Sequence, residues 1–162
     1  RGAVEKTYLA LVEGVPHAPQ LSINEPLALS GASAVRVRMH VDPAGATATT
    51  EVTLVETRRA PDGSPISLLS CRPRTGRQHQ IRAHLAHIGL PLVGDKIYGS
   101  DETRFIRFTE HALTPDDTQA LRLDRHALHA WRVSLRHPQS GAPLAFESPL
   151  GPDLTQFWSS CV

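Results

Sequence analysis

The sequence has few of the residues that mark several classes of protein. Among its 162 residues are only two cysteines, Cys71 and Cys161, far apart and without the spacing of a metal site. They predict reduced thiols rather than a disulfide framework, and with them a cytoplasmic protein. No apolar run approaches the about 20 residues that a membrane span requires, so we expect no membrane contact. The net charge of +1 excludes a general attraction to nucleic acid.

Acidic residues and lysines are scarce where the positive charge is densest. No Asp or Glu lies between Asp62 and Asp95, and Lys6 and Lys96 are the only lysines among 17 basic residues. The segment 72–99 therefore carries its charge on arginine, whose planar guanidinium binds carboxylates and phosphates through two parallel hydrogen bonds. This pattern indicates a local anion site. The alternative is a solvated basic helix on an ordinary domain.

The same segment has the pattern of a helix over 76–88. Thr75 is a suitable N-cap, and Gln78 three residues later completes a capping box. Gly89 supplies the stop. Apolar residues recur at helical spacing between these signals, at Ile81, Leu85 and Ile88. Arg82 then lies beside the buried stripe, and the free N–H groups of the first turn favour an anion such as phosphate.

The rest of the sequence predicts a sheet protein. Strands are expected at 8–12, 35–41, 50–57, 66–71, 128–135 and 144–146. Turn residues join the third to the fourth of these and the fifth to the sixth as hairpins. Residues 15–30 are expected to be irregular, 101–119 to hold a short helix, and 152–158 to form another. Antiparallel hairpins with few helices indicate an α+β fold in one domain.

Three motifs, in order, resemble the RluA-type pseudouridine synthases, which isomerise uridine in ribosomal and transfer RNA. The longest runs Pro73-Arg-Thr-Gly-Arg-Gln-His-Gln-Ile-Arg-Ala-His84 and then Gly89-Leu-Pro-Leu-Val-Gly-Asp-Lys-Ile-Tyr-Gly99. The other two are Lys6-Thr-Tyr8 and His126-Ala-Leu-His-Ala130. So long a match is far more specific than a short motif.

The resemblance implies a pseudouridine synthase-like fold, a mixed and largely antiparallel sheet with flanking helices. Residues 1–162 would form a single partial domain, the C-terminal portion of the catalytic domain, with an N-terminal portion missing. The implied reaction breaks the C1′–N1 glycosidic bond, turns the uracil and rejoins it through C5. It implies structured rRNA or tRNA as partner, no cofactor, no metal and a monomer.

The resemblance also assigns roles to single residues. Tyr8 would be the active-site tyrosine, stacked on the target base, and a candidate proton acceptor. Arg82 would pair with the nucleophilic aspartate and hold it ionised. Ile81 and Leu128 would form apolar walls around the flipped uracil. The candidates for phosphate contacts are Arg72, Arg74, Arg77 and Arg36, and His79 and Gln80 are further substrate-binding candidates.

One part of the family pattern is missing from the sequence. The family nucleophile is the Asp of a His-Arg-Leu-Asp-x-x-Thr-Ser-Gly motif, which the printed residues do not contain. We therefore expect this chain alone to be inactive. Two alternatives stay open: a non-catalytic RNA-binding module, and a hydrolase that uses Asp124 of Leu121-Arg-Leu-Asp124 with His126 or His129. A solvated charged residue in the turn before the strand at 128–135 is the more ordinary role for Asp124.

Each of these residues also has a purely structural interpretation. Without the resemblance, Tyr8 would be a core tyrosine with a bonded hydroxyl, and Arg82 a surface residue lying along its helix. His84 and His87 have the spacing of two zinc ligands but no suitable third ligand. Asp95 is expected to tie down the turn at 94–99.

Overall fold

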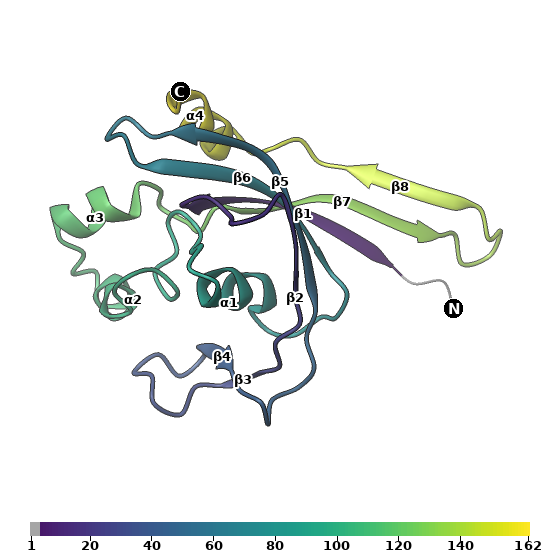
Figure 1. The fold of residues 1–162 in the computed structure, drawn as a ribbon, viewed down its shortest axis with the longest axis horizontal. Helices are drawn as coiled ribbons and strands as arrows, with labels where there is room; N and C mark the ends of the chain where they lie inside the picture. Colours follow the sequence, from purple (N-terminus) through teal and green to yellow (C-terminus); the bar gives the residue numbers. More distant parts are fainter. Residues whose placement is uncertain (1–3) are drawn as a thin grey trace.

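A six-stranded antiparallel sheet forms the centre of the molecule (Figure 1). The computed structural model describes residues 4–162, and the sheet has the strand order β2-β5-β6-β1-β7-β8. Its strands are β1 (Glu5–Glu13), β2 (Gln20–Ile23), β5 (Thr50–Arg59), β6 (Pro65–Pro73), β7 (Leu128–Arg136) and β8 (Pro143–Glu147). The pairings β5–β6 and β7–β8 confirm the two predicted hairpins.

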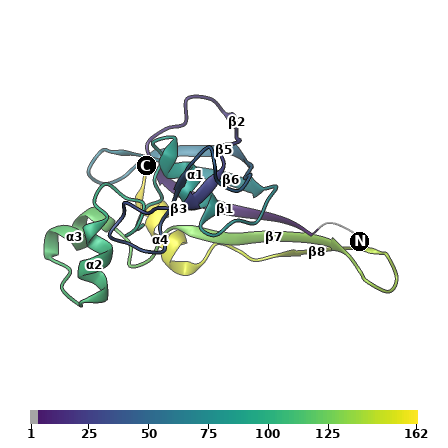
Figure 2. The same ribbon diagram turned by 90° about the horizontal axis from the view of Figure 1, so that it is seen from below.

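Four helices and a small second sheet complete the fold of residues 4–162. The second sheet pairs β3 (Leu27–Leu29) with β4 (Met39–Val41). The helices are α1 (Gln80–His87), α2 (Thr103–Thr109), α3 (Pro115–Leu121) and α4 (Pro152–Ser160). In both ribbon views α2 and α3 lie at the end of the molecule opposite the β7–β8 hairpin (Figures 1 and 2). This combination confirms the α+β prediction.

The central strand β1 shows why helices cover both faces of the sheet. Successive side chains of a strand point to opposite faces. Ala10 and Val12 pack in one core cluster with α1, whereas Leu11 between them packs in a second cluster with α4. These three side chains are almost completely buried. The alternation places α1 on one face and α4 on the other, and fixes α1 against the strands that carry Tyr8 and Cys71.

Helix α1 begins later than its capping pattern predicts. The Thr75 hydroxyl accepts a hydrogen bond from the Thr49 N–H (3.0 Å) and donates to Gln80 Oε1 (2.8 Å), so it caps no helical turn. The predicted capping box with Gln78 is therefore wrong, and α1 starts at Gln80. Its predicted end is confirmed, because Gly89 follows with a φ of +78°.

The segment 15–41 also differs from prediction. The expected irregular region contains β2 and β3, and the expected strand over 35–41 shrinks to Met39–Val41. The physical reason lies at Val35, which is buried in a third core cluster and followed by a turn closed by the Arg38 N–H on the Val35 carbonyl (2.9 Å). This turn leaves Arg36 exposed.

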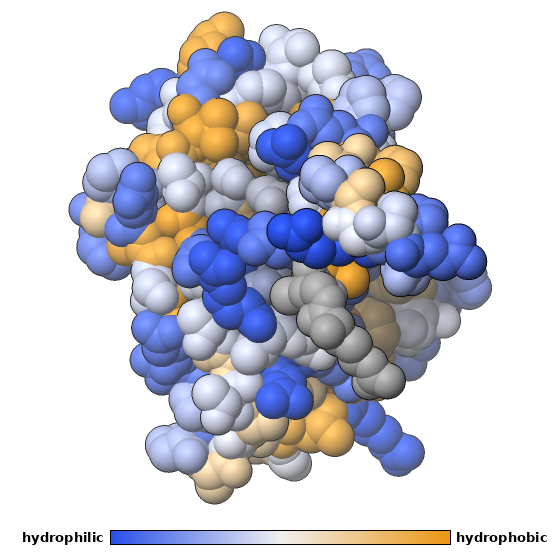
Figure 3. All heavy atoms as spheres, turned by 90° about the vertical axis from the view of Figure 1, so that its right-hand side faces the viewer, coloured by the Kyte–Doolittle hydropathy of each residue, from blue (hydrophilic) through white to orange (hydrophobic). Residues whose placement is uncertain are grey.

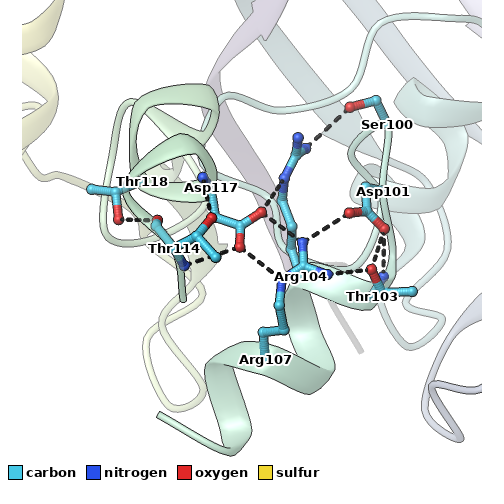
Figure 4. Close-up of polar contacts among 8 residues, drawn as sticks. All are labelled: Ser100, Asp101, Thr103, Arg104, Arg107, Thr114, Asp117 and Thr118. Atoms are coloured by element: carbon cyan, nitrogen blue, oxygen red, sulfur yellow. Dashed lines mark hydrogen bonds and ion pairs between the residues drawn. The ribbon is translucent and has the colours of Figure 1, made fainter. Parts of the chain in front are cut away.

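The connection 101–119 holds two helices rather than one. Asp117 joins them, since its carboxylate accepts two hydrogen bonds from Arg107 on α2 (2.6 and 2.7 Å; Figure 4). Asp117 and Thr114 also form the capping box that starts α3. Asp101 accepts from Arg107 as well (2.9 Å). Paired carboxylates thus order a segment whose sequence carries little hydrophobic pattern.

The β7–β8 hairpin projects beyond the body of the fold together with the beginning of β1 (Figures 1 and 2). Figure 3 shows this end of the molecule as mostly hydrophilic, with separate apolar areas. Val4 and Phe146 are among the exposed apolar residues of the chain. No helix within residues 4–162 has the length and hydrophobicity to cross a membrane.

Candidate functional site

The three sequence motifs meet at one cavity of about 600 Å³. It lies where β1, the loop from β6 to α1, the first turn of α1 and the residues around the start of β7 come together. Of the predicted site residues it is lined by Tyr8, Arg74, Arg77, His79, Gln80, Ile81, Arg82 and Leu128. Arg72 and Arg36 are not among its lining residues. We call this site the Tyr8–Arg82 cavity.

Tyr8 stands at an irregularity of the sheet. The register of β1 against β7 shifts between Thr7 and Tyr8, and such bulges redirect side chains near functional sites. The Tyr8 ring is partly buried and packs with Leu128 against the core cluster below α1. Within residues 4–162 its hydroxyl has no hydrogen-bond partner. The ring is therefore fixed while its polar end is free for a ligand.

Arg82 forms a two-point ion pair with Asp95. Its Nε donates to Asp95 Oδ2 and its Nη2 to Oδ1, both at 2.8 Å. The Asp95 side chain is completely buried and that of Arg82 is 12% exposed. Burial alone would raise the pKa of Asp95, but the hydrogen bonds and charge of Arg82 outweigh it and hold the pKa below its usual value. The expected pairing of Arg82 with a nucleophilic aspartate stays a prediction.

The turn that carries Asp95 is fixed by its own backbone. Asp95 Oδ1 accepts hydrogen bonds from the N–H groups of Ile97 and Tyr98, both at 3.0 Å, which confirms its expected role in the turn at 94–99. Gly94 has a φ of +73°, and a Cβ there would lie 2.2 Å from the Arg125 carbonyl oxygen. Only glycine fits, so this turn packs directly on the segment leading to β7.

Tyr98 connects Arg82 with His79. The Arg82 Cζ atom lies 5.0 Å from the centre of the Tyr98 ring, a cation–π contact. The Tyr98 hydroxyl accepts from the Met39 N–H (2.8 Å) and lies 3.1 Å from His79 Nδ1. Burial and the charge of Arg82 lower the pKa of His79. His79 thus lines the cavity beside Tyr98, in surroundings that favour its uncharged form.

Two titratable residues of the cavity, His126 and Lys6, were not among the site residues predicted from the resemblance, and His126 was considered only for the hydrolase alternative. Burial, and then the charge of Arg82, lower the pKa of His126. Both missed residues stand inside the motifs that were recognised, Lys6-Thr-Tyr8 and the one that begins at His126. Their position next to Tyr8 and Leu128 was the available signal.

Each of the three arginines predicted to contact phosphate before α1 already has a partner within the described residues. Arg77 is exposed and donates from Nε to the Thr47 carbonyl (3.0 Å). Arg74 pairs with Glu51 at 2.8 Å, and Arg72 pairs with Glu5 at 2.5 Å outside the cavity.

Gln80 is buried, and both ends of its amide are engaged. Its Nε2 donates to the Thr49 carbonyl (2.9 Å) and to Thr50 Oγ1 (3.0 Å). Its Oε1 accepts from the Thr75 hydroxyl and the Arg77 N–H. Gln80 therefore supports the loop of the cavity, and its contact with substrate stays a prediction.

The residues of the hydrolase alternative do not converge. Asp124 is exposed, and its carbonyl accepts from Lys96 Nζ. His129 Nε2 contacts the Ser148 carbonyl at 2.9 Å, while His126 lines the Tyr8–Arg82 cavity without Asp124. This arrangement contradicts a hydrolase built on Asp124.

The zinc interpretation of His84 finds no support within residues 4–162. His84 is completely buried, with Nδ1 2.9 Å from Thr50 Oγ1 and Nε2 2.9 Å from the Glu25 carbonyl. No group of three or more metal-ligating side chains occurs in this part of the chain. Both nitrogens of His84 therefore serve the packing of α1.

Comparison with known proteins identifies the family. A sequence model described as RNA pseudouridylate synthase matches residues 1–87, more than half of the chain. The chain belongs to the RNA pseudouridylate synthase family. This membership confirms the resemblance read from the three motifs, and the cavity lies where those motifs of the family meet.

Relatives and solved structures agree with this membership. The chain is 38% identical to ribosomal large subunit pseudouridine synthase D of Nitrosomonas europaea, over 93% of this chain and 39% of the relative. It is 31% identical to the chloroplastic RNA pseudouridine synthase 2 of Arabidopsis thaliana, over 94% and 37%. The structure of human RNA Pseudouridylate Synthase Domain Containing 1 matches with a TM-score of 0.69 and 25% identity, over 93% of this chain and 57% of that one. The chain thus spans about two fifths of the curated relatives.

Proposed function

We propose that this chain forms part of the catalytic domain of an RNA pseudouridine synthase, and that the Tyr8–Arg82 cavity receives the uridine. The observation that carries this proposal is the meeting of three separate family motifs at one cavity. Its wall combines an aromatic ring, two apolar side chains and a guanidinium, supplied by Tyr8, Ile81, Leu128 and Arg82. Enzymes that act on a base bind it outside the stack in such an apolar pocket with a few polar groups.

The cavity suits the chemistry of the isomerisation. The C1′–N1 bond breaks, the uracil turns, and C1′ joins C5; the proton on C5 leaves and N1 gains one, so the product is an isomer of the substrate. In this proposal Tyr8, whose hydroxyl has no partner within residues 4–162, takes the C5 proton. Ile81 and Leu128 limit the space in which the ring turns.

The nucleophile in this proposal is an aspartate from polypeptide outside the 162 residues. The family motif that carries it is not in the printed sequence, and Asp124 is exposed away from the cavity. Arg82 would hold that aspartate ionised at the reacting carbon. We further propose that the RNA is ribosomal or transfer RNA and that the protein acts as a cytoplasmic monomer.

Isomerisation by the natural full-length protein tests this function. The protein is incubated with ribosomal and transfer RNA transcripts, which are then digested to nucleosides and separated by chromatography. Conversion of uridine to pseudouridine at a defined position supports the proposal. Absence of pseudouridine from every transcript, with folded protein and bound RNA, would overturn it.

RNA binding by this chain alone tests whether arginines around the cavity contact the RNA. Arg77→Ala removes an exposed guanidinium from the rim of the cavity, so affinity for RNA should fall and the slope of log K against log salt should drop by about one. Arg136→Ala is the matched control, because Arg136 is also exposed and also donates to a backbone carbonyl, that of Gly141 (3.1 Å), on the β7–β8 hairpin. Equal losses in both variants would contradict a contact specific to the cavity.

A further inference from the structure

The geometry points to Asp95 as the positioning residue of the reaction: it holds one edge of the Arg82 guanidinium so that the other edge faces the Tyr8–Arg82 cavity and receives the nucleophilic carboxylate. This inference rests on the proposed function and adds to it a second carboxylate, within this chain, that acts through Arg82. Asp95 itself touches no substrate.

The hydrogen-bonding capacity of arginine allows two carboxylates at once. A guanidinium has five N–H donors in a rigid plane. Asp95 takes one from Nε and one from Nη2, both at 2.8 Å. Two donors on Nη1 and one on Nη2 remain, and they form a second edge suited to another two-point contact. The ion pair therefore orients Arg82 and leaves donors on Nη1 and Nη2 available for a second carboxylate.

The second edge is open to the cavity. Arg82 lines the cavity, and its side chain is 12% exposed whereas that of Asp95 is completely buried. Within residues 4–162 no buried side-chain nitrogen or oxygen lacks a hydrogen-bond partner. The Nη1 atom of Arg82 has no partner in this part of the chain, so it must be accessible. Because Arg82 lines the cavity, we infer that these accessible donors face it.

Asp95 can direct Arg82 because it is itself immobilised. Its Oδ1 accepts from the N–H groups of Ile97 and Tyr98, and Gly94 before it has no room for a side chain. The Tyr98 ring lies against the guanidinium at 5.0 Å. One edge and one face of the guanidinium are therefore fixed before any ligand binds, which is the preorganisation that an electrostatic catalyst requires.

Replacing the Asp95 carboxylate should separate binding from turnover. Asp95→Asn keeps an oxygen for the two backbone donors but removes the charge and one acceptor for Arg82. Arg82 then loses its orientation, and a displacement of about 1 Å in a reacting group costs about 10²-fold in rate. The cavity also gains one net positive charge, so KM for RNA should stay equal or fall. Unfolded protein would lower the apparent kcat at unchanged KM, so kcat is expressed per folded protein and compared with a variant that is destabilised outside the cavity.

The control is a carboxylate that also accepts a two-point pair from an arginine but does not line the Tyr8–Arg82 cavity. Asp117 accepts a two-point pair from Arg107 and one backbone N–H, that of Thr114, within the α2–α3 connection (Figure 4). Asp117→Asn should therefore lower thermal stability and leave both kcat and KM unchanged. If Asp95→Asn does not fold, Asp95→Ser takes its place, since its hydroxyl can accept from the Ile97 N–H but makes no two-point pair.

The experiment measures pseudouridine formation by the natural full-length protein and these variants at several RNA concentrations, per folded protein. A fall in kcat of about 10²-fold for Asp95→Asn at unchanged or lower KM, with Asp117→Asn as active as the unchanged protein, supports the inference. Equal kcat values for Asp95→Asn and Asp117→Asn would overturn it, whether both are active or both impaired. An inactive unchanged protein would instead defeat the proposed function, and the inference with it.

Discussion

Arg82→Ala should destabilise the fold far more than the loss of an ordinary surface arginine. The substitution leaves the completely buried carboxylate of Asp95 without its counter-charge. Removing one partner of a buried ion pair costs about 3–5 kcal/mol. Asp95 keeps hydrogen bonds from two backbone N–H groups, so we expect the lower end, about 3 kcal/mol. At a urea m-value of about 2 kcal/mol per M, the midpoint of unfolding should fall by about 1.5 M.

Arg125→Ala is the matched control for this measurement. Arg125 makes the same two-point pair with Asp153, at 2.7 and 2.9 Å, but both side chains are more than 40% exposed. An exposed pair contributes about 0–1 kcal/mol. Both variants are unfolded in urea at neutral pH and followed by circular dichroism. A difference between them of less than about 1 kcal/mol would refute the reasoning that burial makes the Arg82–Asp95 pair structural.

The loss of stability in Arg82→Ala should depend on pH. In the unchanged protein the pKa of Asp95 lies below its usual value, so the pair stabilises the fold above the unfolded pKa of about 3.9 and this stability is lost as the pH falls. In the variant, burial without Arg82 raises that pKa. The two stability curves should therefore approach each other below about pH 4. A constant gap down to pH 3 would contradict the assignment to Asp95.

Two further predictions concern groups outside the cavity. Burial raises the pKa of the Cys71 thiol to about 12, so Cys71 should not react with iodoacetamide at pH 8 in the native protein and should react in urea; labelling of Cys71 in the native state would contradict its burial. The pKa of Asp101 is held at about 2 by hydrogen bonds from Thr103 and Arg107, and the pKa of Asp117 is lowered by Arg107. A carboxylate with a depressed pKa stabilises the fold above about pH 4, and this stabilisation is lost as the pH falls. Asp117→Asn should therefore reduce the free energy of unfolding at pH 7, and its difference from the unchanged protein should narrow toward about pH 2. A difference that widens in acid would be inconsistent with the pairing.

The parts of the fold that depend on local signals could be predicted from the sequence. The β5–β6 hairpin follows from two apolar runs around a turn rich in Pro, Gly and Asp, and the end of α1 from Gly89. A hairpin register and a glycine stop are set by neighbours within a few residues. These features need no knowledge of distant contacts.

The start of α1 could not be predicted, because a distant residue decides it. Thr75 and Gln78 fit a capping box locally, but the Thr49 backbone N–H, 26 positions earlier, binds the Thr75 hydroxyl instead. The Gln80 side chain then closes the loop. A local capping pattern competes with tertiary hydrogen bonds, and here the tertiary bonds are stronger in sum.

The candidate site was likewise predictable in part, from the motifs but not from contacts between distant residues. The motifs indicated Tyr8, Ile81, Arg82 and Leu128, and the structure brings all four to one cavity. The Arg82–Asp95 pair was missed, although Asp95 lies in the same motif, because the turn at 94–99 must fold back against α1 before the two side chains meet. Sequence order showed an arginine without an acidic neighbour; the fold supplies one from 13 positions away.

The most direct test of the Tyr8–Arg82 cavity as a uridine site is the rate of pseudouridine formation by the natural full-length protein and its Tyr8→Phe variant. Phenylalanine keeps the ring that packs with Leu128 and removes the hydroxyl that is free within residues 4–162. Loss of a proton-transferring group costs about 10²–10⁴-fold. We predict pseudouridine formation by the unchanged protein and a loss of at least about 10²-fold in Tyr8→Phe, with RNA affinity unchanged. Equal rates in the two proteins would contradict the central role of this cavity.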